Sequence, residues 1–147
     1  MMRHLFLGLG LMLLSDCAAA DTMAEGMANG MESPSWQGAI AAHADVSDFA
    51  VAIDENSWRE LWQRIGQPAP SPLPEGQMAV AVFLGQKRSG GYKAEIVGVQ
   101  EHESNLTVSY REHRPRLGAM VTQVITSPYA VTLLPLTTLP VKFEKAD

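Results

Sequence analysis

The clearest pattern of apolar positions is helical and lies between residues 58 and 65, where apolar side chains recur at every third and fourth position. Four residues form this apolar face: Trp58, Leu61, Trp62 and Ile65. Charged and amide side chains occupy most of the other positions, so we expect both tryptophans in the core rather than in a ligand shelf. Asp54 or Asn56 can cap the start of this helix, and Gly66 can end it.

From residue 77 onward the apolar pattern is that of β-strands. Residues 78–84 (MAVAVFL) are all apolar, which is typical of a central strand buried on both faces. Residues 106–111 alternate between apolar and polar side chains, as in a half-buried strand. Further strands are predicted at 48–53, 92–99, 120–125, 129–134 and 141–144, the last of them at a sheet edge.

Six or seven short strands and a single helix predict an α+β fold. We expect a mostly antiparallel β-sheet, or a small open barrel or sandwich, with the amphipathic helix packed against one face or end. Four prolines alternate with other residues directly after the helix: Pro68, Pro70, Pro72 and Pro74. They predict an extended, stiff connection, because proline fits neither a helix interior nor a central strand.

The first 20 residues have the three zones of a cleavable signal peptide. Arg3 gives a positive start, residues 5–14 are an apolar run, and Cys17 opens a short small-residue segment that ends at Ala20. The apolar run is too short to span a bilayer, which needs about 20 residues. We expect cleavage after Ala20 and a periplasmic or secreted protein. The alternative is a lipoprotein anchored at Cys17, but Asp16 stands where a lipoprotein signal needs a small residue.

Residues 21–44 are expected to be a flexible tether, and residues 45–147 one folded domain. The start of the tether is rich in Ala, Gly, Met and Ser, so it buries too little apolar surface to offset the entropy of ordering it. Met23, Met27 and Met31 recur at every fourth position, and thioethers favour Cu(I). No His or Cys lies among them, so a copper site is only a minor alternative.

The composition argues against two classes of partner. Arg3 and Asp16 leave with the leader, so the mature chain keeps the net charge of −5. A mildly acidic domain without a basic stripe is a poor candidate for binding nucleic acid or for holding anionic lipid by charge. We expect membrane contact only if Cys17 is lipidated. Cys17 is the single cysteine, so the mature domain has no disulfide.

The residues form no recognisable catalytic or metal-binding pattern. His43, His102 and His113 are scattered and lack the close spacing common in zinc sites. No G-x-S-x-G or S-x-x-K motif is present, and no glycine-rich turn leads from a strand into a helix to hold phosphates. The sequence therefore indicates no cofactor, no metal and no enzyme. A small-ligand binder or an enzyme whose site is assembled from distant residues stays open as an alternative.

A glycine loop, residues 85–92, is the candidate contact site. Lys87 and Arg88 are expected to be exposed charges, and Gly90-Gly91 lets a partner's backbone come close. Tyr92 offers a rigid aromatic surface. The simpler alternative is a hairpin turn, in which the glycines only supply positive φ angles.

Five segments carry a family resemblance: Trp58–Trp62, Met78–Gly85, Ser89–Tyr92, Val121–Tyr129 and Leu139–Phe143. In order and spacing they resemble the C-terminal domain of the protease complex subunit PrcB family. The glycine-glycine-tyrosine loop followed by the Ser-Pro-Tyr turn is the most specific part. A weaker likeness of the glycine loop is to chagasin-like cysteine protease inhibitors, which keeps a protease-inhibitor-like module as a minor alternative.

The resemblance implies a non-catalytic exported accessory module that supports the assembly or stability of an envelope protease complex. Its partner would be another exported protein, such as a protease. We expect the contact in the glycine loop and in the turn 126–129, with the two tyrosines as anchors. The candidate partner-binding residues are Lys87, Arg88, Ser89, Gly90, Gly91, Tyr92, Thr126, Pro128 and Tyr129.

Overall fold

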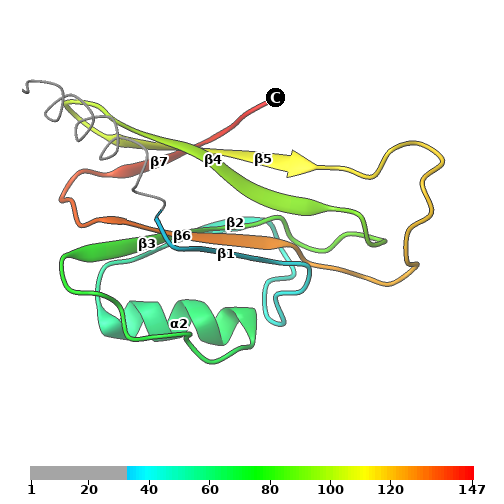
Figure 1. The fold of residues 1–147 in the computed structure, drawn as a ribbon, viewed down its shortest axis with the longest axis horizontal. Helices are drawn as coiled ribbons and strands as arrows, with labels where there is room; N and C mark the ends of the chain where they lie inside the picture. The colour runs from blue at the N-terminus through cyan, green and yellow to red at the C-terminus, as the bar shows by residue number, and fades with distance from the viewer. Residues whose placement is uncertain (1–32) are drawn as a thin grey trace, which may run out of the picture. The chain divides into compact units, whose positions relative to one another are not determined.

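Two neighbouring strands, β3 (Gln77–Phe83) and β6 (Tyr129–Pro135), form the centre of the fold (Figure 1). The computed structural model describes residues 33–147, so the predicted signal peptide, Cys17 and the three spaced methionines lie outside the described residues. β3 and β6 pair antiparallel over the whole length of both strands. With β1 (Ser35–Gly38) and β2 (Asp48–Ala52) they form a four-stranded sheet in the order β1-β6-β3-β2.

β3 is buried on both faces, as its continuous apolar run predicts. Successive side chains of a strand point to opposite faces of the sheet. Ala79, Ala81 and Phe83 therefore pack on the helix side, in one cluster with Trp58 and Trp62. Met78, Val80 and Val82 point the other way and pack against a second sheet. The predicted central strand is confirmed.

The second sheet has three strands in the order β4-β5-β7. β4 (Lys93–Glu101) and β5 (Leu106–His113) are antiparallel, with a bulge between Ile96 and Gly98. β7 (Val141–Lys145) pairs parallel to β5 at the sheet edge. Phe143 of β7 reaches the first sheet, where its ring stacks on Phe49 of β2 at 4.4 Å between centroids. This stack closes one side of the space between the sheets.

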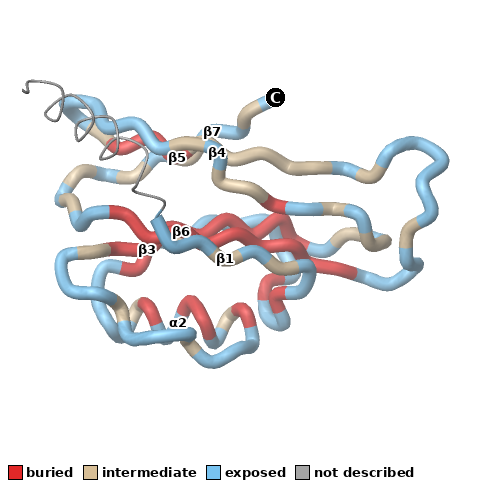
Figure 2. Tube along the Cα trace, in the orientation of Figure 1, coloured by how far each residue is buried: buried red, intermediate tan, exposed pale blue. Residues whose placement is uncertain are grey.

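Helix α2 (Glu55–Ile65) covers the outer face of the four-stranded sheet, so the domain has three layers (Figure 1). Its first turn is capped by Asp54, whose carboxylate accepts a hydrogen bond from Ser57 N at 2.8 Å. Its last turn ends at Gly66, which has a φ of 89°. Figure 2 shows the buried residues on the inner side of α2 and along the central strands. The predicted α+β class, the helix and both of its ends are confirmed.

The prolines lie in an extended segment that runs back along the helix. Trp58 Nε1 donates a hydrogen bond to the carbonyl of Ser71 at 2.8 Å, and Leu73 N donates one to a Glu55 carboxylate oxygen at 2.9 Å. These two bonds hold the segment against α2. Among residues 33–147, no helix is long and apolar enough to cross a membrane.

The expected tether ends earlier than residue 44. From Ser33 onward the chain is part of the folded unit, because β1 pairs with β6 and Ala41 and Ala44 are buried in the core. The ring of Trp36 lies 5.7 Å from that of Trp58 and 5.6 Å from that of Trp62. β1 has only four residues, too few to show an alternating pattern, and its partner strand lies more than ninety positions further along the chain.

The strand predicted at 120–125 is wrong. These residues belong to a loop between β5 and β6, and Met120, Val124 and Ile125 are exposed. The apolar composition alone suggested a strand, but a strand needs a neighbour for its backbone hydrogen bonds. Among the described residues, the glycine loop gives this segment a single backbone hydrogen bond, from Gly90 N to the carbonyl of Thr122.

Replacing Trp36 tests whether β1 belongs to the domain. We expect Trp36→Ala to lower the free energy of unfolding by about 2–4 kcal/mol, because it leaves a void beside two buried tryptophans. The exposed neighbour Gln37 is the control, and Gln37→Ala should change this free energy by less than about 0.5 kcal/mol. Urea unfolding followed by tryptophan fluorescence measures both. A neutral Trp36→Ala would mean that residues 33–44 are a tether after all.

Candidate functional site

The glycine loop (residues 85–92) and the long loop (residues 114–128) meet at one end of the sheets (Figure 1). Their backbones form a short antiparallel bridge between Lys87 and Thr126. Lys87 N donates to Thr126 O at 2.7 Å, and Thr126 N donates back to Lys87 O at 3.0 Å. The two segments that the sequence singles out are therefore brought together.

Further contacts hold the two loops together beyond this bridge. Gly90 N donates to the carbonyl of Thr122 at 2.8 Å, and the Thr126 hydroxyl donates to the carbonyl of Ser89 at 2.8 Å. Gly91 has a φ of 90°, and a Cβ there would lie 2.8 Å from Pro115 Cβ. The close approach that these glycines allow is thus to the long loop.

The turn 126–129 lies inside the domain. Thr126 is 5% exposed and Tyr129 is 4% exposed, and Pro128 is among the largest fully buried side chains. Burial raises the pKa of the Tyr129 hydroxyl, and this ring fills the space beside Gly38 of β1. These three residues position the long loop and leave no free surface for a partner.

The accessible residues of the predicted partner-binding site lie in the glycine loop. Arg88 and Gly91 are exposed, and Lys87, Ser89, Gly90 and Tyr92 are partly exposed. The Lys87 ammonium lies 5.4 Å from the centre of the Tyr92 ring, a cation–π distance. This contact favours one orientation of the Tyr92 side chain, which lowers the entropy lost when it contacts a partner.

Glu112 of β5 is the electrostatic centre beneath both loops. Its side chain is 8% exposed, and its oxygens lie 3.1 Å from Lys87 Nζ, 3.1 Å from Lys145 Nζ and 3.4 Å from Arg114 Nε. Burial by itself raises the pKa of this carboxyl, but hydrogen bonds from Lys87 and Lys145 outweigh burial. The pKa of Glu112 therefore lies below its ordinary value, and the carboxylate stays charged at neutral pH.

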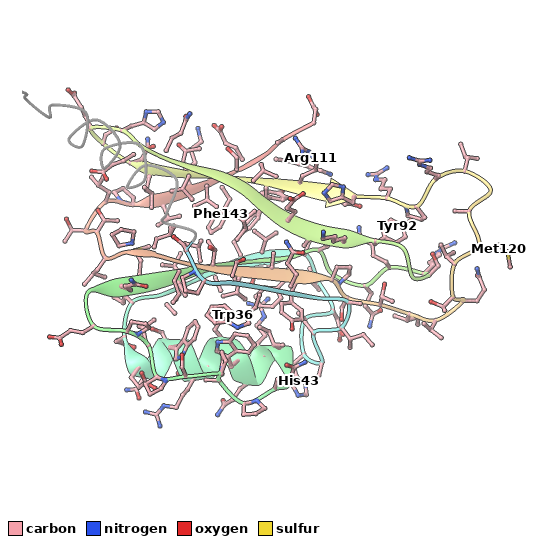
Figure 3. All side chains as sticks on the ribbon, viewed as in Figure 1. Trp36, His43, Tyr92, Arg111, Met120 and Phe143 are labelled. Carbon is pink, nitrogen blue, oxygen red and sulfur yellow. The ribbon has the colours of Figure 1, made fainter. Side chains whose placement is uncertain are left out.

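A groove of about 370 Å³ runs beside the glycine loop. It is lined on one side by the end of β1 and on the other by the start of β4: Gln37, Gly38, Ala39, Gly91, Tyr92 and Lys93. β1 and β4 are the edge strands of their sheets, so the groove lies between two strand edges. Figure 3 shows Tyr92 at the junction of the glycine loop and β4.

Other polar groups of the domain serve the fold. His113 Nε2 bonds a Glu95 carboxylate oxygen at 2.5 Å, and this hydrogen bond holds the pKa of Glu95 below its ordinary value. His43 and His102 are exposed. Within residues 33–147, no group of three or more His, Cys, Asp or Glu side chains lies close enough to hold a metal ion.

A hollow of about 580 Å³ lies between α2 and the proline segment. Its charged residues are already engaged, since Glu55 accepts the bond from Leu73 N and Arg59 bonds Asn56 at 2.9 Å. Trp62 also lines the hollow, and its indole N–H is buried without a partner in the described part of the chain. Nothing there brings titratable groups together as a catalytic site needs.

The sequence interpretation missed two parts of the site. β1 supplies one wall of the groove, and the only signal for it was Trp36, an aromatic residue within the expected tether. Glu112 lies in a run of charged residues, Arg111–Arg116, which by itself indicates a solvated loop. Its role depends on Lys87 and Lys145, which come from distant segments.

One comparison with known protein families matches a stretch of the chain that contains both loops of this site. The family model described as PrcB C-terminal matches residues 78–135. The match begins in β3 and ends in β6, so it contains the central strand pair, β4, β5 and both loops. No curated protein and no solved structure matches the chain.

Replacing Glu112 tests whether it holds the two loops together. We expect Glu112→Gln to lower the free energy of unfolding at pH 7 by about 1–3 kcal/mol, because three cations lose their buried counter-charge. Glu144 forms an exposed pair with Lys142, and Glu144→Gln should cost less than about 0.5 kcal/mol.

The pH dependence of the same variants gives a second readout. A carboxyl whose pKa is lowered by folding stabilises fully above its unfolded value and loses this effect as the pH falls through the folded value. The deficit of Glu112→Gln should therefore be complete above about pH 5 and shrink at lower pH, through and below the ordinary value of 4.5. Urea unfolding between pH 3 and 7 measures it, and a deficit independent of pH would contradict the assignment.

Proposed function

We propose that this chain, whose residues 78–135 match the PrcB C-terminal family, is a non-catalytic accessory module that supports the assembly or stability of an envelope protease complex. Membership of this family suggests association with a protease complex. We assign that contact to one place on the domain.

The groove between β1 and β4 carries the proposal. β1 is an edge strand, and no described strand pairs with its outer side. Backbone N–H and C=O groups on such an edge can pair with an extended segment of a partner, a mode known as β-augmentation. Gly38 and Ala39 keep the wall of the groove low, so that an incoming backbone can come close to the strand edge.

Tyr92 and Lys93 supply the specificity of the proposed contact. Both line the groove opposite β1. Tyr92 contacts Lys87 and offers an aromatic face, and tyrosine is a kind of residue that carries much of the binding energy at interfaces. Lys93 is exposed, so we expect the partner segment to carry an acidic side chain near the tyrosine.

We propose further that the protein is exported. The proposal rests on the leader: a positive start, ten apolar residues from Leu5 to Leu14, and Ala18 and Ala20 before the expected cleavage site. An envelope location would place the domain in the same compartment as the proposed protease partner.

Replacing Tyr92 tests the groove. The full chain, with a C-terminal tag, is produced in its native organism, and the retained chains are labelled with active-site probes for proteases. We expect a protease to be retained with the wild-type chain and its affinity to fall at least about tenfold with Tyr92→Ala. Val97→Ala, an exposed position further along β4, should retain it fully. Equal retention by Tyr92→Ala, with an unchanged unfolding midpoint, would exclude the groove.

The mass of the mature chain tests export. Expressed with its own leader in a Gram-negative host, the protein should appear in the periplasm or medium and begin at Asp21. A chain that begins at Cys17 and carries the added mass of acyl chains would instead indicate the lipoprotein alternative. An intact leader on a cytoplasmic chain would contradict both.

A further inference from the structure

The outer part of the long loop exposes apolar side chains that the fold does not use. Leu117 and Met120 are fully exposed, and Val124 and Ile125 are more than half exposed. Figure 3 shows Met120 on the outermost part of this loop, beyond the ends of the strands, and Figure 2 shows the loop as mostly exposed. Single exposed apolar residues are ordinary, but four on one projecting loop favour an interaction site.

The loop is built to hold these side chains outward. Ala119 N donates to the carbonyl of Arg116 at 2.9 Å, and Gly118 has a φ of 80°. This is the geometry of a turn with glycine at its third position, as a type II turn requires. Leu117 lies within the turn and Met120 directly after it. The bonds from Gly90 and Lys87 fix the loop a few residues further on, so its outer part projects from a rigid base.

Positive charge gathers at the same end of the domain. The glycine loop and the long loop carry Lys87, Arg88, Arg114 and Arg116, four of the eleven basic residues of the chain and none of its sixteen acidic residues. Glu112, beneath the loops, offsets part of this charge through Lys87, Lys145 and Arg114. Arg88 and Arg116 are exposed and form none of the ion pairs seen in residues 33–147. The net charge of −5 for the whole chain conceals this local excess.

We infer that the tip of the long loop inserts into an anionic membrane surface, independently of any lipid on Cys17. Leu117 and Met120 enter the boundary between headgroups and acyl chains, while Arg88 and Arg116 contact the anionic headgroups. Apolar side chains flanked by arginines are the composition of interfacial membrane segments, and each cation near an anionic surface strengthens binding. The tip projects beyond the ends of the strands, as insertion into a bilayer surface requires. This differs from the expectation based on net charge, because the relevant charge is local.

Vesicle binding tests the inference. The mature chain, which begins at Asp21 and so lacks both the apolar leader and Cys17, is used, and co-sedimentation is measured with vesicles of phosphatidylcholine alone or mixed with phosphatidylglycerol. We expect binding to the mixed vesicles, at least about tenfold weaker binding to phosphatidylcholine alone, and weaker binding at high salt. No binding to the mixed vesicles would overturn the inference.

Two double variants and a control separate the contributions. Leu117→Ser/Met120→Ser should weaken binding to the mixed vesicles at least about tenfold, and Arg88→Gln/Arg116→Gln should weaken it and reduce its dependence on salt. The control, Ile53→Ser/Leu136→Ser, removes two exposed apolar residues at the opposite end of the four-stranded sheet and should bind like the parent. Unchanged binding by Leu117→Ser/Met120→Ser would exclude insertion of the tip.

A probe on the loop reports insertion directly. In the same mature chain, which has no other cysteine, Met120→Cys provides one thiol for an environment-sensitive dye, whose emission should shift to the blue on mixed vesicles only. If Leu117→Ser/Met120→Ser instead releases the protease retained in the Tyr92 experiment while vesicles do not bind, the tip is a protein contact and the inference is wrong. If vesicle binding holds while Tyr92→Ala retains the protease, the groove fails and the membrane inference stands.

Discussion

The fold depends on the burial of the β3–β6 pair on both faces. Ala79, Ala81 and Phe83 need the helix on one face, and Met78, Val80 and Val82 need the second sheet on the other. Apolar burial is worth about 25 cal/mol per Å², so neither face can be left to water without a large loss of stability. This one constraint demands three layers. It also explains why α2 carries its tryptophans on one face, and why β7 crosses over to complete the second sheet.

The same strand pair determines where the two loops lie. β3 leads into the glycine loop, and the long loop leads into β6, at the end of the sheet where Phe83 is paired with Tyr129. The loops are therefore neighbours because their strands are neighbours. The hydrogen bonds at Lys87, Gly90 and Thr126 then make them one unit, and Glu112 gathers three cations beneath that unit. Such a base is stiff enough to present side chains in fixed positions.

The two proposed contact surfaces differ in chemistry although they share this base. The groove between β1 and β4 offers a strand edge, low glycine and alanine walls and a tyrosine, which suits an extended polypeptide. The tip of the long loop offers apolar side chains and arginines on a projecting loop, which suits a bilayer. An accessory module that contacts a protease through one surface and an anionic membrane through the other would hold that protease close to the membrane.

The sequence by itself determined the α+β class, helix α2 with its caps, the central strand and the glycine loop, because each depends on local periodicity or on the conformational preferences of single residues. The family resemblance likewise rested on local motifs, and the match to residues 78–135 confirmed it. The tertiary structure decided what depends on distant partners. β1 is a strand only because β6 lies beside it, and residues 120–125 are a loop because no strand of residues 33–147 lies beside them. Tyr129 is buried because Gly38 leaves room for its ring. The ion pairs of Glu112 and the groove are likewise formed by segments that lie far apart in the sequence. Short-range sequence patterns carry no information about such contacts.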